Sequence, residues 1–146
     1  SLGVNPKVVT SAVNLALAQR LVRRICPDCA EKKQLDGTDK ERVMKILESI
    51  PDARYLEGLQ TETIWVSSGC ETCSQTGYKG RVGVYEGIRT DSEIETIIQQ
   101  NSSEREIRKA ARNQNLLTMA QDGVIKVLEG RTTLEELNRV IDLEEI

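Results

Sequence analysis

Histidine and phenylalanine are absent from this chain of 146 residues, and aromatic residues make up only 3% of it. Without histidine, the chain has no imidazole for general-base catalysis and no mixed cysteine–histidine metal site. Without phenylalanine, its apolar side chains are mainly Leu, Ile, Val and Ala. This composition favours packed helices over a β-sandwich built on aromatic pairs, so we expect an α+β fold that is mainly helical.

The chain also lacks a basic surplus, because its formal net charge is −3 and its pI is about 5.2. Proteins that bind duplex nucleic acid carry a clear excess of Lys and Arg, whose charges displace phosphate counterions. The few aromatic residues are too scattered along the sequence for a base-stacking platform. We therefore expect no nucleic-acid partner.

No apolar run approaches the roughly 20 residues needed to cross a bilayer. The most apolar segment, residues 8–25, is interrupted by Asn14, Gln19 and several arginines, so it does not resemble a signal peptide. Because the cysteines form CxxC pairs and no export signal is recognised, we expect a cytoplasmic protein without a transmembrane segment.

Familiar catalytic motifs are missing as well. The sequence contains no GxxxxGK[ST] phosphate loop and no GxSxG nucleophile elbow. Together with the lack of histidine, this leaves no recognisable active site. We predict that the chain holds no catalytic residue and that it is not an enzyme by itself.

The first two predicted elements are helices. Apolar residues recur at every fourth position over residues 9–25, which predicts a helix at residues 8–24 that stops before Pro27. Thr38 and Glu41 have the spacing of a capping box, and they predict the start of a second helix.

Strands and short helices are predicted further along the chain. Strands are expected at residues 63–66 and 81–88, the second of which alternates apolar and polar side chains. From residue 90 onward, four S/T-x-x-E/Q boxes predict four short helices. These boxes begin at Thr90, Ser103, Thr118 and Thr133. Gly130 is expected to end the third of these helices.

The cysteines form two CxxC pairs, separated by residues 30–69. The pairs are Cys26 with Cys29 and Cys70 with Cys73. In a CxxC knuckle both sulfurs face one ion, and backbone N–H groups point at the sulfurs. Two knuckles supply a tetrahedron of thiolates at about 2.3 Å from the ion, which is the closed geometry of a structural zinc site. We predict that these four cysteines bind zinc and that the filled site is not catalytic.

Other interpretations of the cysteines stay open. A redox CxxC pair normally lies in a thioredoxin-like βαβ context, which the pattern lacks. Two disulfides would suit a secreted protein, and iron in a rubredoxin-like site fits the same spacing. A tetrathiolate zinc carries a net charge near −2, and we expect neighbouring cations such as Arg23 and Lys32 to offset it.

Several blocks of the sequence are distinctive in combination. The most specific runs Ala18-Gln-Arg-Leu-Val-Arg-Arg-Ile-Cys26, within residues 11–29. The others are residues 3–6, 69–86, 110–112 and 122–137. In this order they resemble the bacterial assembly ATPases of type II secretion and type IV pilus extension, with residues 30–68 as the poorly matched part.

The resemblance implies a place for each segment in such an ATPase. The chain would be its C-terminal, non-catalytic region. Residues 1–25 would be a helix at the end of a RecA-like motor core, and residues 80–89 a strand that returns to this core. Residues 26–79 would form an inserted tetracysteine zinc subdomain, and residues 90–146 a C-terminal helical subdomain. Retraction ATPases of the superfamily lack the insert, which favours the extension or secretion branch.

The resemblance also implies partners and cofactors. Members of the family form hexameric rings in the cytoplasm, peripheral to the inner membrane. The implied partners are neighbouring subunits, the inner-membrane platform protein and its cytoplasmic adaptors. ATP and magnesium would bind in the parent protein only, where the phosphate loop lies. The alternative function is a free-standing zinc-knuckle module that binds protein or nucleic acid.

Four residues outside the cysteine pairs are weighed as functional candidates. Gln19 and Arg20 lie in the most specific block, so they could approach a nucleotide or a subunit boundary in the ring. The simpler interpretation places them on the surface of the predicted helix. Arg112 and Arg131 are likewise expected to be solvated side chains.

Overall fold

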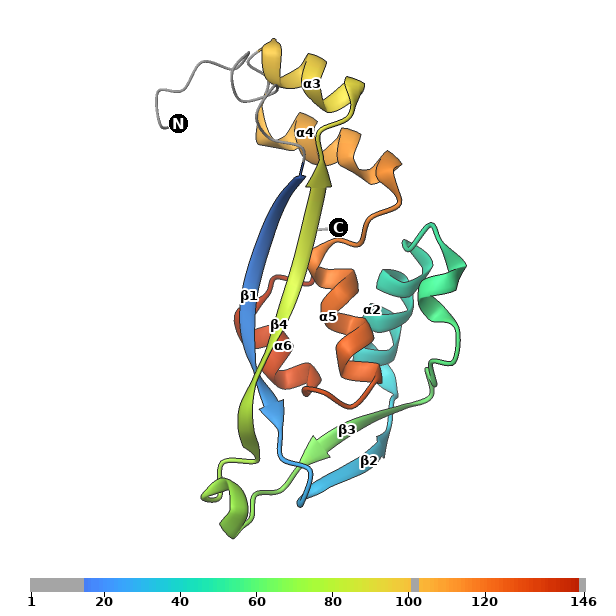
Figure 1. Ribbon diagram of the computed structural model, residues 1–146. Helices are drawn as coiled ribbons and strands as arrows, with labels where there is room; N and C mark the ends of the chain where they lie inside the picture. Colours follow the sequence, from blue (N-terminus) through green and yellow to red (C-terminus); the bar gives the residue numbers. More distant parts are fainter. Residues whose placement is uncertain (1–14, 101–102, 145–146) are drawn as a thin grey trace. The chain divides into compact units, whose positions relative to one another are not determined.

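The computed structural model describes residues 15–100 and 103–144, and their fold mixes helices with two small sheets (Figure 1). Strand β1 (Leu15–Ile25) pairs with β4 (Tyr78–Arg89), and β2 (Ala30–Gln34) pairs with β3 (Thr63–Ser67). The predicted α+β class is therefore confirmed. No helix in the described part of the chain is long and apolar enough to cross a membrane.

Residues 15–25 form strand β1, so the helix predicted there is wrong. A step of four residues is an even step, and the apolar positions 17, 21 and 25 therefore share one side of a strand as well as one face of a helix. Pairing with β4 provides backbone hydrogen bonds along one edge of β1, and this tertiary pairing overrides the local pattern. The rest of the predicted helix, residues 8–14, lies outside the described residues.

Both predicted strands are confirmed, since residues 63–66 lie in β3 and residues 81–88 lie in β4. Strand β3 runs antiparallel to β2, with Ala30 opposite Ser67 and Gln34 opposite Thr63. The sequence analysis missed β2, because its sequence, AEKKQ, shows no apolar alternation.

The second predicted helix is α2 (Gly37–Glu48), but its capping differs from the prediction. The N-cap residue is Asp36, and no side chain caps this helix end, so the Thr38 box is wrong. Helix α2 buries Val43, Ile46 and Leu47. A short 3-10 helix, η1 (Ala53–Leu56), follows it.

Among the described residues after position 90, the chain forms four α-helices, as predicted. They are α3 (Ser92–Gln99), α4 (Glu104–Ala111), α5 (Met119–Leu128) and α6 (Leu134–Val140), with the 3-10 turn η3 (Arg112–Gln114) after α4. Gly130 follows the third of them with a φ of +78°, which confirms it as the residue that ends α5.

The capping boxes of these helices are only partly confirmed. Ser103 and Thr118 form reciprocal boxes, as predicted. Thr90 does not cap α3, because the adjacent Asp91 accepts the bond from the Ile94 N–H at 2.9 Å. Thr133 caps α6 without a reciprocal bond, since the carboxylate it was expected to meet has other partners.

The chain divides into two compact units. Of the described residues, 15–18, 86–100 and 103–116 make up the smaller unit, which contains α3 and α4. The larger unit, residues 19–85 and 117–144, contains β2, β3, α2, α5 and α6. Buried side chains from all these elements except β2 form one hydrophobic core in the larger unit, with Ile46, Ile64, Val124 and Leu137 among them. The cysteine-bearing segment, residues 26–73, therefore shares a hydrophobic core with α5 and α6.

Candidate metal centre

The fold brings all four cysteines together. Cys26 follows β1 directly, Cys29 precedes β2, and the other two begin and end the 3-10 turn η2 (Glu71–Cys73) as its N-cap and last residue. The four ligand sulfurs lie within 4.8 Å of one another. We call Cys26, Cys29, Cys70 and Cys73 the cysteine cluster, a group that could hold a metal ion.

The distances within the cysteine cluster suit one shared ion. The Sγ atoms of Cys26 and Cys70 are 3.8 Å apart, and those of Cys29 and Cys73 are 3.9 Å apart. Within the second knuckle, Cys70 and Cys73 are separated by 3.7 Å. A tetrahedron of thiolates at about 2.3 Å from its centre has edges of about 3.8 Å. A disulfide requires about 2.05 Å, so these sulfurs are not bonded to each other.

Two backbone N–H groups, one within the second knuckle and one shortly after it, point at one sulfur of this knuckle, as predicted. The N–H groups of Cys70 and Gly77 each donate to Cys73 Sγ at 3.2 Å. The turn also requires glycine at position 69, where φ is +91° and a Cβ atom would lie 2.8 Å from the carbonyl oxygen of Gln75.

Burial and backbone N–H donors shift the pKa values of the thiols in opposite directions. Burial raises the pKa of the Cys29 thiol to about 12. Burial also raises the pKa of Cys73, but the N–H donors of Cys70 and Gly77 outweigh it and bring that pKa down to about 6. The cluster thus favours a thiolate at Cys73, and a bound cation would favour thiolates at the other positions as well.

Two cations that were expected to offset the cluster have other contacts. The Arg23 guanidinium bonds a carboxylate of α6, with Nη2 3.0 Å from Oε1 of Glu136. Lys32 Nζ lies 5.4 Å from the centroid of the Trp65 ring, at cation–π distance. Arg23 therefore already neutralises a carboxylate, and its role as a counter-charge to the thiolates stays a prediction.

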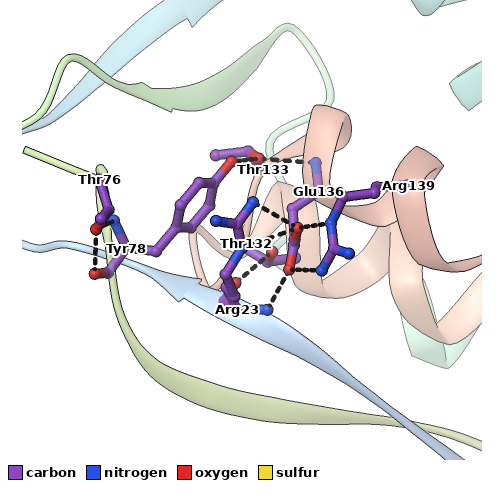
Figure 2. A network of polar contacts seen from close by, with 7 residues as sticks. All are labelled: Arg23, Thr76, Tyr78, Thr132, Thr133, Glu136 and Arg139. Atoms are coloured by element: carbon purple, nitrogen blue, oxygen red, sulfur yellow. Dashed lines mark hydrogen bonds and ion pairs between the residues drawn. The ribbon is translucent and has the colours of Figure 1, made fainter.

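A second polar group lies beside β1, centred on the buried carboxylate of Glu136 in α6 (Figure 2). Glu136 is 1% exposed. Its oxygens accept bonds from the Arg23 backbone N–H at 2.6 Å and from the Arg139 Nε at 2.7 Å. Burial raises the pKa of Glu136, but the Arg139 and Arg23 donors outweigh it and lower that pKa to about 2.

Sequence reasoning missed this carboxylate as a tertiary contact. Arg23 and Glu136 are separated by 113 residues, and no local spacing connects them. The one available signal was the box formed by Thr133 and Glu136, which assigned the carboxylate to a helix cap.

The other candidate residues lie on the surface. Gln19 and Arg20 are exposed on β1, where Gln19 Nε2 donates to the Tyr85 hydroxyl at 3.2 Å. Arg112 is exposed, and Arg131 pairs with Glu129 at 2.9 Å. The structure brings none of them into the cysteine cluster.

Comparison with known proteins decides the family. A family model described as type II/IV secretion system protein matches residues 1–139. The chain belongs to this family. Type II secretion system protein E of Aeromonas hydrophila is 36% identical over 95% of the chain, and type IV pilus assembly ATPase PilB of Thermus thermophilus is 37% identical over 93% of it.

The chain of this type II/IV secretion system protein corresponds to a small part of its relatives. It spans 25% of the Aeromonas protein and 14% of the Thermus protein. Type IV pilus assembly ATPase TfpB of Acinetobacter baylyi is 34% identical over 97% of the chain, which covers 23% of that protein. The resemblance stated from the sequence is confirmed, and relatives from both secretion and pilus systems match.

Proposed function

We propose that the cysteine cluster binds one structural zinc ion. The observation that carries this proposal is the clustering of all four sulfurs within 4.8 Å of one another. The Cys26–Cys70, Cys29–Cys73 and Cys70–Cys73 sulfur pairs, 3.7–3.9 Å apart, match the edges of a tetrathiolate tetrahedron. Four protein ligands fill the coordination sphere and leave no open position for a substrate. The ion would therefore stabilise the larger unit and would not take part in catalysis.

Metal content per chain tests this proposal. We expect one zinc ion per chain in protein purified without chelator, measured by elemental analysis. On the same sample, all four thiols should be protected from alkylation and should react once a chelator and a denaturant are added. One iron per chain would replace zinc in the proposal, and metal-free protein with disulfide-bonded cysteines would overturn it.

We further propose that the chain is the C-terminal, non-catalytic part of a hexameric cytoplasmic ATPase that drives type II secretion or type IV pilus assembly. The names of the relatives support an ATPase, and the small share of their length that the chain spans leaves room for a motor core. In this proposal residues 1–25 and 80–89 belong to the RecA-like core, residues 26–79 form the zinc subdomain, and residues 90–146 complete the C-terminal region.

Exposed apolar side chains on β1 support the proposal that another part of the parent protein covers this strand. Leu15, Leu17 and Leu21 are 54%, 67% and 49% exposed. A monomer rarely leaves such a row of leucines in water, because covering it gains free energy from the hydrophobic effect. The motor core of the parent protein is the proposed cover.

The parent protein would bind ATP and magnesium in that core. Its proposed partners are the neighbouring subunits of the ring, the platform protein of the inner membrane and the cytoplasmic adaptors of that platform. The protein would lie at the cytoplasmic face of the inner membrane.

An ATPase assay on the chain and on the longer gene product tests this proposal. We expect the 146-residue chain to show no magnesium-dependent ATPase activity and the longer gene product to hydrolyse ATP. We also expect a GxxxxGK[ST] motif encoded upstream of residue 1, at a distance of about one domain, which is about 100–200 residues. Hydrolysis by the chain alone, or a gene product without this motif, would contradict the proposal.

A further inference from the structure

The chain segments on either side of the cysteine cluster both contact the start of α6. One segment is the end of β1, which leads into Cys26, and the other is the segment after Cys73. Figure 2 shows their meeting point, where Arg23 and Tyr78 lie against Glu136 and its neighbours. These contacts connect the proposed metal site to a helix that supplies no ligand.

The end of β1 is fixed by three hydrogen bonds. The Arg23 N–H donates to Glu136 Oε2 at 2.6 Å, and the Thr132 hydroxyl donates to the Arg23 carbonyl at 2.8 Å. The N–H of Ile25 donates to the carbonyl of Arg131 at 3.0 Å. The first ligand of the cluster follows Ile25 directly, so these bonds set where its backbone begins.

The segment after the second knuckle is fixed in a similar way. Gly77 donates its N–H to Cys73 Sγ at 3.2 Å and accepts the Cys26 N–H at 2.9 Å, so it joins the two knuckles. The next residue, Tyr78, shares a hydrogen bond of 2.7 Å between its hydroxyl and that of Thr133. This bond attaches the segment to the N-cap of α6.

Glu136 connects the two segments. Its backbone N–H donates to Thr133 Oγ1 at 3.1 Å, and its carboxylate holds Arg23, whose guanidinium carbon lies 4.2 Å from the centroid of the Tyr78 ring. The Glu136 side chain is 0% exposed. Because a buried charge is stable only with partners in fixed positions, the carboxylate constrains both segments.

We propose that Glu136 is a positioning residue of the metal centre, which holds the two knuckles at the separation that one ion requires. This inference rests on the proposed zinc site. Coupling between two sites is reciprocal, so metal binding must in turn stabilise the docking of α6. Glu136 acts through Arg23, Thr133 and Tyr78, without contact to the ion.

Zinc affinity tests the inference in the 146-residue chain, by competition with a chromophoric chelator. We expect Glu136→Gln to bind zinc about tenfold more weakly, the lower end of the effect of outer residues around metal sites. The matched control is Glu135→Gln, which makes the same change of charge at the exposed neighbouring position of α6 and should leave the affinity unchanged.

Cobalt substitution distinguishes positioning from a general loss of stability. We expect Glu136→Gln to shift the visible absorption bands of the Co²⁺ form, because the sulfurs no longer meet the ion in the same geometry. Leu47→Ala weakens the same core from α2 and should leave the band positions unchanged. Tyr78→Phe removes only the hydroxyl that bonds Thr133, and it carries the test if Glu136→Gln does not fold.

Hydrogen exchange measures the reverse effect, that of metal binding on the stability of α6. Removal of zinc from the wild-type chain should lower the protection of the Leu137 and Ile141 amides, which bond to Thr133 and Leu137 at the two ends of α6. If Glu136→Gln and Tyr78→Phe both bind zinc with wild-type affinity and keep the wild-type Co²⁺ absorption bands, the inference is overturned and the metal site still stands. A wild-type chain that binds no metal would overturn both.

Discussion

Cys73→Ser is expected to release the metal and to unfold the larger unit of the chain. Cys73 is 5% exposed and accepts two backbone N–H bonds, and a serine hydroxyl is neither ionised nor soft enough to replace its thiolate. Structural zinc contributes about 10–16 kcal/mol of apparent binding free energy in small zinc domains. This is comparable to the net stability of a typical domain, about 5–15 kcal/mol.

The effect should extend beyond the segment that carries the cysteines. Helices α5 and α6 share one hydrophobic core with α2 and β3, so loss of the metal is expected to lower amide protection in all four elements. Trp65 provides an optical probe, since it is the single tryptophan and packs against Gly130 at the end of α5. Its fluorescence should report the unfolding without a label.

Thr72→Ala is the matched control, because Thr72 is exposed within the same knuckle and supplies no ligand. This variant should keep one zinc per chain and the wild-type unfolding curve. Cys73→Ser protein that lacks metal but retains native protection in α5 and α6 would show that the cysteine-bearing segment folds separately from them.

Leu137→Ala is expected to destabilise the larger unit by about 2–5 kcal/mol, the range for deletion of a buried leucine side chain. Leu137 is 0% exposed, between α6 and the rest of the core. Its side chain packs against Gly123 of α5, where an added Cβ atom would lie 2.5 Å from Leu137 Cδ1. Since Gly123 has no side chain that could fill the space, we expect a value near the upper end.

Urea unfolding followed by Trp65 fluorescence measures this loss, with metal content checked on the same samples. Leu21→Ala serves as the control, because it deletes the same atoms from a side chain that is 49% exposed on β1. Its cost should stay below about 1 kcal/mol. Equal midpoints for the two variants would contradict the packing of α6 described above.

Local patterns predicted those elements whose signals lie within a few residues. Alternation predicted the segment now seen in β4, and two reciprocal capping boxes predicted the starts of α4 and α5. The same kind of reasoning gave the wrong element at residues 15–25, because an apolar step of four fits both a helix and a strand. Only the pairing of β1 with β4 decides between them.

The candidate metal site could also be predicted, because its sequence signals are local. The CxxC spacing fixes each knuckle locally, and the chemistry of four thiols leaves few ions to choose from. By contrast, the carboxylate that joins these knuckles to α6 could not be found in the sequence. Its partner lies 113 residues away, and its own local pattern indicated a helix cap.

The sequence by itself therefore determined the α+β class, the four candidate ligands, the second strand of the β1–β4 pair and the family. The tertiary structure decided that residues 15–25 are a strand, that β2 exists, and that the cysteine-bearing segment shares a core with α5 and α6. The physical reason is the range of the forces involved. Ligand spacing, caps and turns act between neighbours in the chain, whereas strand pairing, burial and the Arg23–Glu136 ion pair depend on groups that meet only after the chain has folded.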